Sequence, residues 1–403
     1  MRRSKHFDES ITTSSFFRKI NFELYQIIRS YFVKLYFKII KSEQFQLVDL
    51  FSYFQPGIFT YPNVIGFDTM DNIMLSDNSL LSIINYENNK YLVSVGFNEE
   101  RVRVYFIAIS GDITTDFKPQ ELIDIILREA IYYSGYLGKI IKLQYDDYRD
   151  EVLFKILPLP KTTLNQIYLR DSDKQELIDF VDAVKTNKVG LRYLLIGEPG
   201  TGKTETIRAI ISESLKIRSD LTVLIADAGS NISLNTLFSY AEIFKPVLVC
   251  IDDIDLLVGS RDSRLHPQNL STALQVLDGL STNQDIFLLA TTNDKNLVDY
   301  ALRRPGRFDL ILEFGNLEPS FYKELVFRET GNEDLAQLFC DEEITKILTN
   351  LRATGAFLVT LVKYLNRERF KQNKYDKDTI LKAINKLQQS FRRDSKNKDT
   401  IGF

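Results

Sequence analysis

The stretch "YLLIGEPGTGKTETI", residues 193–207, joins an apolar run, a glycine-rich segment and a helix-forming segment. It fits the pattern G-x-x-x-x-G-K-S/T, with Gly197, Gly202, Lys203 and Thr204 at the fixed positions. Glycines let backbone N–H groups converge on phosphate oxygens, and the start of a helix adds partial positive charge. The stretch therefore predicts a triphosphate site, with Lys203 near the outer phosphates and the Thr204 hydroxyl on Mg²⁺.

A second apolar run, "VLVCIDD" at residues 247–253, ends in two carboxylates. In open α/β sheets, ligands bind beyond the carboxyl ends of the strands. We therefore expect Asp252 to hold the Mg²⁺ shell and Asp253 to orient or deprotonate the attacking water. The alternative role for Asp253 is to cap a helix or turn.

Two later segments add polar groups. "LLATTND", residues 288–294, places Asn293 at a strand end, where a neutral amide can position water without adding negative charge. The alternative for Asn293 is an Asx turn. "ALRRPGRFD", residues 301–309, carries Arg304 and Arg307 around a rigid Pro-Gly pair. These guanidinium groups either lie on a solvated basic loop or project toward the γ-phosphate of a neighbouring subunit.

Together and in this order, the four elements resemble an AAA ATPase, of the AAA+ superfamily, from about residue 161 to 390. The resemblance implies binding of ATP and Mg²⁺ and hydrolysis of ATP, with Thr204 and Asp252 as metal ligands. It makes Asp253, Asn293 and the two arginines, Arg304 and Arg307, the catalytic groups. It also assigns nucleotide contacts to the loop, the adenine pocket and the sensor 2 region: Gly197, Glu198, Pro199, Gly200, Thr201, Gly202, Lys203, Thr204, Glu205, Ile167, Tyr168, Gly355 and Ala356.

Two features depart from the family's pattern. The second acid of the carboxylate pair is usually glutamate, and the shorter Asp253 leaves slow hydrolysis open. The segment "ADAGSNISLNTLFSYAEIFKP", residues 226–246, lacks the aromatic–apolar–Gly triplet of threading members. We expect Phe238, Tyr240 and Phe244 to be core residues on a helix face instead. The shortened segment and the aspartate are similar to the mitochondrial AAA translocases that handle the folded Rieske protein.

Residues 1–157 predict an α+β domain for client recognition or assembly. Its expected elements are a helix from about residue 16 to 41, a strand pair at 90–97 and 101–110, a helix at 118–134 and strands at 139–145 and 151–157. Pro119 fits the first turn of the second helix.

Residues 158–316 predict the nucleotide-binding domain, since short apolar runs alternate with helical patterns, as in a parallel sheet covered on both faces. Residues 317–403 predict a helical lid and a basic C-terminal tail, with turns at 330–334 and 352–355. The predicted fold class is α/β: a P-loop parallel-sheet ATPase domain with a C-terminal helical lid, preceded by an α+β N-terminal domain.

The charge composition bears on which class of binding partner the sequence predicts. The net charge of −3 and the pI of about 5.7 give no global argument for nucleic acid. Residues 1–41 hold nine Lys/Arg against three Asp/Glu, and residues 363–398 hold twelve against four. These basic ends leave contact with nucleic acid or a membrane surface open, beside the plainer reading of solvated helix faces.

Location is also predicted. The two cysteines, Cys250 and Cys340, cannot form a disulfide framework, and they predict buried thiols in a reducing, cytoplasmic interior. The most apolar early segment, residues 22–41, is interrupted by basic residues, so we expect no transmembrane segment.

The resemblance implies a ring, as a homo-hexamer or another closed oligomer, that remodels or moves a protein client without threading it. Two other functions stay open. One is a nucleic-acid-associated AAA ATPase, and the other is a nucleotide-gated assembly scaffold with slow turnover.

Overall fold

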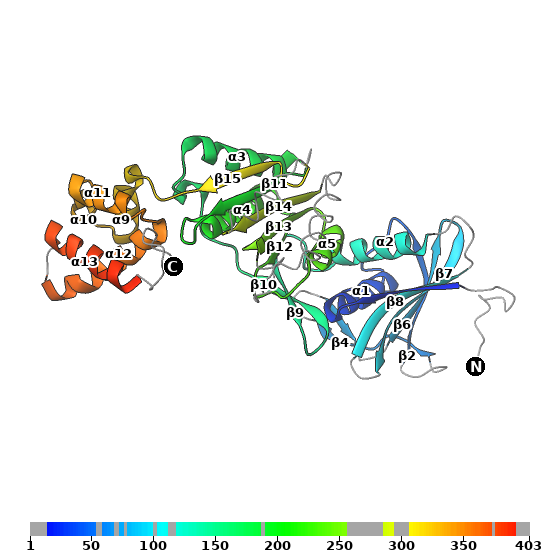
Figure 1. Ribbon diagram of the computed structural model, residues 1–403. Helices are drawn as coiled ribbons and strands as arrows, with labels where there is room; N and C mark the ends of the chain where they lie inside the picture. The colour runs from blue at the N-terminus through cyan, green and yellow to red at the C-terminus, as the bar shows by residue number, and fades with distance from the viewer. Residues whose placement is uncertain are drawn as a thin grey trace. The chain divides into compact units, whose positions relative to one another are not determined.

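The computed structural model in Figure 1 describes residues 14–53, 59–67, 72–75, 79–99, 103–111, 118–186, 190–255, 285–293, 306–372 and 375–391. The chain divides into two compact units. Unit 1 comprises residues 1–158 and 220–247, and unit 2 comprises residues 159–219 and 248–403. Residues 220–247 thus group with the N-terminal part of the chain. The division into three contiguous domains stays a prediction.

Unit 1 is built on an antiparallel sheet with the strand order β1-β8-β7-β6-β2-β3. The bounds are β1 (Ser14–Ile20), β2 (Gln46–Tyr53), β3 (Phe59–Thr60), β6 (Ser79–Tyr86), β7 (Asn89–Glu99) and β8 (Arg103–Gly111). A separate hairpin is formed by β4 (Val64–Phe67) and β5 (Ile73–Leu75). The pairing of β7 with β8 confirms the predicted strand pair, whose register places Asn98 opposite Val104.

Two helices, α1 (Phe22–Tyr36) and α2 (Pro119–Tyr132), contact each other and strand β8 of this sheet (Figure 1). The predicted helix at 118–134 is confirmed, with Pro119 in its first turn. The predicted helix from about 16 to 41 is wrong at both ends. Residues 14–20 pair with β8 as a strand, and the Asn21 side chain then caps α1 by accepting from the Leu24 N–H. Lys38 has a left-handed φ of 58°, which ends the helical path.

Three further strands belong to unit 1. The two predicted strands are confirmed as β9 (Ile140–Asp146) and β10 (Glu151–Leu157), which form an antiparallel hairpin, and β12 (Thr222–Ala226) runs parallel to β9. The helix α5 (Leu234–Ile243) follows β12. The side chains of Phe238, Tyr240 and Phe244 are buried, so the aromatic residues of this segment are core residues, as expected.

Unit 2 holds the predicted parallel strands other than β12, which groups with unit 1. β13 (Val247–Ile251), β14 (Ile286–Thr292), β11 (Arg192–Gly197) and β15 (Leu310–Phe314) follow one another in the sheet, and β11 is parallel to both neighbours. The helices α3 (Asp171–Thr186) and α4 (Lys203–Ile217) contact each other, and α4 contacts β11 and β14. β15 was not predicted, because Glu313 interrupts its short apolar run and its five residues show no strict alternation.

The C-terminal part of unit 2 is helical, as predicted. It consists of α9 (Tyr322–Thr330), α10 (Glu333–Leu338), α11 (Glu342–Asn350), α12 (Gly355–Gln372) and α13 (Lys377–Phe391). These helices share one apolar cluster, in which Phe339, Phe357 and Leu361 are buried. Asn332 and Asp341 cap α10 and α11. The turns expected at 330–334 and 352–355 are confirmed by these helix ends.

The two cysteine thiols differ in their exposure to solvent. Cys250 on β13 is buried, whereas Cys340 is exposed, so the prediction of two buried thiols is wrong for Cys340. Cys340 lies two residues after the end of α10, and it is not part of the apolar cluster of the C-terminal helices. In the part of the chain that the structure describes, no helix is long and apolar enough to cross a bilayer.

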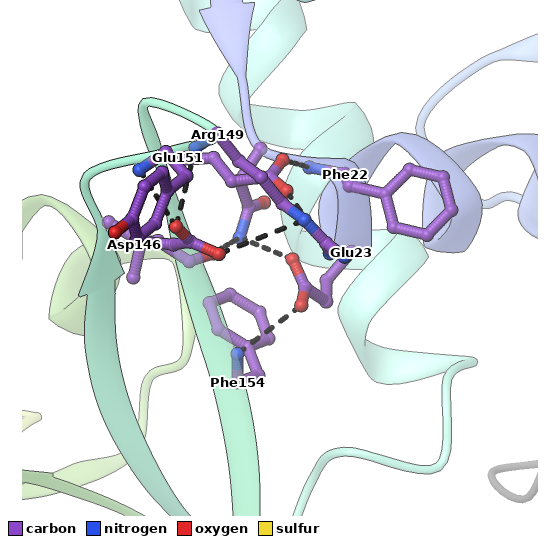
Figure 2. A network of polar contacts seen from close by, with 9 residues as sticks. Phe22, Glu23, Asp146, Arg149, Glu151 and Phe154 are labelled. Atoms are coloured by element: carbon purple, nitrogen blue, oxygen red, sulfur yellow. Dashed lines mark hydrogen bonds and ion pairs between the residues drawn. The ribbon is translucent and has the colours of Figure 1, made fainter.

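A network of polar contacts joins the start of α1 to the β9–β10 hairpin (Figure 2). The Glu23 carboxylate accepts from the Phe154 N–H at 3.4 Å and from the Asn21 Nδ2 at 3.1 Å. Glu151 accepts from the Phe22 N–H at 3.2 Å, and Arg149 lies 3.9 Å from Glu151. Burial raises the pKa of Glu23 to about 7, against the two backbone hydrogen bonds that lower it.

The raised pKa of Glu23 makes stability depend on pH. Between the ordinary value of 4.5 and about 7, the folded state binds more protons than the unfolded state, so stability falls as pH rises. The full difference corresponds to about 3 kcal/mol. We expect Glu23→Gln to raise the thermal midpoint, relative to the parent, more at pH 8 than at pH 5. The substitution also changes the hydrogen bonds of this side chain, but it does so at both pH values. The difference between the two shifts in thermal midpoint therefore reports the ionisation of Glu23.

The control is Glu43→Gln, which changes an exposed glutamate of the same unit. Its effect on the midpoint should be the same at pH 5 and pH 8. An equal effect of Glu23→Gln at both pH values would contradict the assignment of a raised pKa to this carboxyl group.

Candidate active site

The loop between β11 and α4 has the backbone that the glycine pattern requires. Gly200 and Gly202 have φ values of 81° and 102°, in the left-handed region that favours glycine. A Cβ on Gly197 would lie 2.3 Å from the carbonyl oxygen of Phe314 on β15, so this position also excludes a side chain. No side chain caps the start of α4 at Gly202, which leaves the first-turn N–H groups to an anion. The residues present therefore fit a phosphate group.

Lys203 begins α4, and its side chain is buried beneath the loop. Its Nζ donates to the carbonyl oxygens of Gly197 at 2.7 Å and Glu198 at 3.0 Å, and to the Asn293 Oδ1 at 2.8 Å. Burial lowers the pKa of the ammonium group, and the nearby carboxylates, with Asp253 first, oppose this change. The positive charge is thus held between the loop and the ends of the neighbouring strands.

The two predicted metal ligands lie together. The Thr204 hydroxyl donates to the Asp252 carboxylate at 3.0 Å. A second hydroxyl, from Thr291 on β14, donates to the same carboxylate at 2.7 Å. Hydroxyl and carboxylate oxygens suit Mg²⁺, which is commonly held by one or two protein oxygens together with waters and phosphates. The donor set therefore fits this ion.

The predicted base and the predicted sensor also meet. Asn293 Nδ2 donates to Asp253 Oδ1 at 2.7 Å, while its Oδ1 accepts from Lys203. Burial raises the pKa of Asp253, and the neighbouring carboxylates Asp252 and Asp255 raise it further. A carboxylate with a raised pKa is a stronger proton acceptor, which suits a general base.

A cavity of about 870 Å³ opens beside the loop in unit 2. Its lining includes Ile167 and Tyr168, which precede α3, and Gly355 and Ala356 at the start of α12. The Ala356 N–H donates to the carbonyl oxygen of Gly200 at 3.1 Å, which ties α12 to the loop. The cavity is within the size range of small-molecule sites.

The rest of the predicted loop contacts fall in the same region. Pro199, Thr201 and Glu205 line the cavity, and Glu198 contributes its carbonyl oxygen to Lys203. The Glu205 carboxylate, however, pairs with Arg208 at 2.5 Å. A contact of Glu205 with a nucleotide would therefore come from its backbone.

Sequence reasoning missed two features around Tyr168. Its ring packs against Phe321, with centroids 5.4 Å apart, and the Arg328 guanidinium lies 4.8 Å from its centroid. Arg328 also donates to the carbonyl oxygen of Gln166 at 2.6 Å. These partners lie more than 150 positions later in the chain, and no local pattern signals such a contact.

Of the two predicted arginines, Arg304 and Arg307, the structure describes only Arg307. Arg304 lies outside the described residues. Gly306, with a φ of 98°, is held through its carbonyl oxygen by Arg192 of β11 at 2.6 Å, and Arg192 also pairs with Asp309 at 3.1 Å. The Arg307 side chain is only 6% exposed. In the observed conformation, this burial therefore disfavours a direct contact between Arg307 and another subunit.

Comparisons with known proteins concern the same part of the chain. Residues 193–316 match the family described as "ATPase family associated with various cellular activities (AAA)". The matched range contains the loop, the carboxylate pair, Asn293 and both arginines.

Curated relatives share the region as well. The ATP-dependent zinc metalloprotease FtsH of Staphylococcus haemolyticus (strain JCSC1435) is 31% identical over 241 residues, 54% of this chain and 32% of that protein. FtsH 1 of Thermoanaerobacter sp. (strain X514) is 32% identical over 195 residues, 44% of this chain and 32% of that protein. The chain thus spans about a third of the length of these relatives.

Proposed function

Because its AAA domain makes this chain an ATPase of the AAA+ superfamily, with ATP and Mg²⁺ as ligands, we propose that it works as a ring that remodels or moves a protein client. The ring is a homo-hexamer or another closed oligomer. The observation that carries the catalytic part is the convergence of Lys203, Asp253 and Asn293 within hydrogen-bonding distance beside the loop.

Each side chain has a separate task in this proposal. Thr204 and Asp252 hold Mg²⁺, which neutralises charge on the phosphates when it is bound. Lys203 contributes a positive charge toward the outer phosphates. Asn293 orients the attacking water, and the Asp253 carboxylate accepts its proton. Lys203 is buried and Asp253 and Asn293 are partly buried, which strengthens their electrostatic interactions.

The Asp253→Asn variant tests the catalytic assignment. An amide keeps the size of the side chain and can still hydrogen-bond, but it cannot accept the proton. We expect turnover to fall by about 10²–10⁴-fold, the usual contribution of a general base, with nucleotide affinity retained. Phosphate release and nucleotide titration measure the two quantities. Asp182→Asn, an exposed position on α3, is the control. Turnover of Asp253→Asn equal to that of the parent would exclude Asp253 as the base.

We assign client recognition to residues 1–157. This part of the chain carries large apolar side chains at the surface, which supports recognition of an apolar client surface. The most exposed in and around α1 and the β4–β5 hairpin are Phe37, Ile39, Tyr61, Ile65 and Phe67. The hydrolysis-deficient Asp253→Asn protein should retain a client long enough for capture and identification.

A cytoplasmic location stays a prediction from the cysteine content.

The client is not threaded through the ring in this proposal. Support comes from the segment after β12, whose aromatic residues Phe238, Tyr240 and Phe244 are buried in unit 1. The resemblance to the mitochondrial Rieske-protein translocases also supports a mode of action without threading. The similarity to the FtsH proteins does not test this resemblance. A stably folded fluorescent reporter fused to a captured client should keep its fluorescence while ATP is consumed. ATP-driven, processive loss of that fluorescence would overturn this part of the proposal.

A further inference from the structure

Thr291 lies one residue before the end of β14, and its side chain is fully buried. Its hydroxyl is shared between the two acidic residues of the site. It accepts from the Asp253 N–H at 2.8 Å and donates to Asp252 Oδ1 at 2.7 Å. A backbone N–H can only donate, so the hydroxyl hydrogen is directed to the carboxylate, and both bonds form at once.

The backbone of Asp253 has a φ of 56°, in the left-handed region. Residues other than glycine adopt this conformation rarely, and it persists where the surroundings hold it in place. The hydrogen bond from the Asp253 N–H to Thr291 is one such restraint. In this conformation the Asp253 carboxylate reaches Asn293 Nδ2 at 2.7 Å.

We propose that Thr291 is a positioning residue for ATP hydrolysis, which anchors the left-handed turn at Asp253 and thereby places its short carboxylate beside Asn293. This inference rests on the proposed role of Asp253 as the base. Aspartate is one methylene shorter than glutamate, and a misplacement of about 1 Å can cost about 10²-fold in rate. The bond from Thr291 to Asp252 gives both acids one common anchor.

Three substitutions separate positioning from general damage to the fold. Thr291→Val keeps the shape of the side chain and removes the hydroxyl, while Thr291→Ser keeps the hydroxyl. Thr292→Val is the matched control, because Thr292 is the next residue, is equally buried and donates to Asp255 at 2.7 Å. Each purified ring is assayed for kcat, for KM and for nucleotide affinity. Hydrogen exchange at the Asp253 amide is measured in the nucleotide-free protein.

We expect Thr291→Val to lower kcat by about 10²-fold with little change in KM, and Thr291→Ser to restore most of the loss. Exchange at the Asp253 amide should accelerate in Thr291→Val only. Thr292→Val should keep most of the turnover. Parent-like kcat in Thr291→Val, unchanged exchange at Asp253, or an equal loss of turnover in Thr292→Val would each overturn the proposal.

The Asp253→Asn background distinguishes this inference from the proposed function. If Thr291 acts through Asp253, Thr291→Val should add no further loss to Asp253→Asn. An inactive Asp253→Asn protein beside a fully active Thr291→Val protein would reject only the role of Thr291. An active Asp253→Asn protein would reject the base itself, and the role of Thr291 with it.

Discussion

The Lys203→Ala variant is expected to lose ATP binding. The Lys203 ammonium is buried and is held by two loop carbonyls and Asn293, in the position where the outer phosphates are proposed to lie. Removing one partner of a buried charge pair costs about 2–5 kcal/mol, which corresponds to a loss of roughly 30-fold to roughly 4,000-fold in affinity. The carboxylates Asp252 and Asp253 would then face the phosphates without this cation. Titration of a fluorescent nucleotide measures the loss directly.

Lys216→Ala is the matched control for this variant. Lys216 lies in the last turn of the same helix, α4, and pairs with Glu213 at 3.3 Å on the surface. Surface pairs of this kind contribute little, so its affinity for nucleotide should equal that of the parent. Undiminished affinity in a folded Lys203→Ala protein would contradict the assignment of the loop as the phosphate site.

Local patterns were sufficient to predict much of the fold. The glycine-rich loop, the helix that starts at Pro119 and the β7–β8 pair each depend on residues close in sequence. Strand β1 was missed because its ladder partner, β8, lies about 90 residues away, and nothing within residues 14–20 distinguishes that strand from the start of the following helix. The physical limit is the non-local pairing that overrides local propensity.

The candidate site shows the same limit. The sequence placed Lys203, Asp252, Asp253 and Asn293 at strand and loop ends, and the structure brings them together. It could not assign a role to Thr291, because the partners of that hydroxyl are Asp252 and Asp253, which follow β13 and lie almost 40 residues earlier in the chain. The burial of Arg307 was equally hidden, since an arginine beside a Pro-Gly pair has the local signature of an exposed loop.

The Arg304→Ala variant is expected to lose hydrolysis while keeping ATP binding. By its place in the motif, Arg304 is proposed to reach the γ-phosphate bound to the adjacent subunit. An arginine supplied in this way contributes about 10³-fold or more in turnover. Phosphate release at saturating ATP measures the loss, and nucleotide titration shows that binding persists. Arg303→Ala, the preceding residue in the sequence, is the control and should retain turnover.

Mixing the subunits tests whether the arginine acts between them. The Asp253→Asn protein lacks the base but keeps Arg304, whereas the Arg304→Ala protein keeps the base. In a mixed ring, an Asp253→Asn subunit can supply Arg304 to the intact site of its Arg304→Ala neighbour, so turnover should return in part. Activity per subunit of the parent should also rise with protein concentration as rings form. If turnover is independent of concentration down to a monomeric sample, and mixing restores none of it, the site is not shared between subunits.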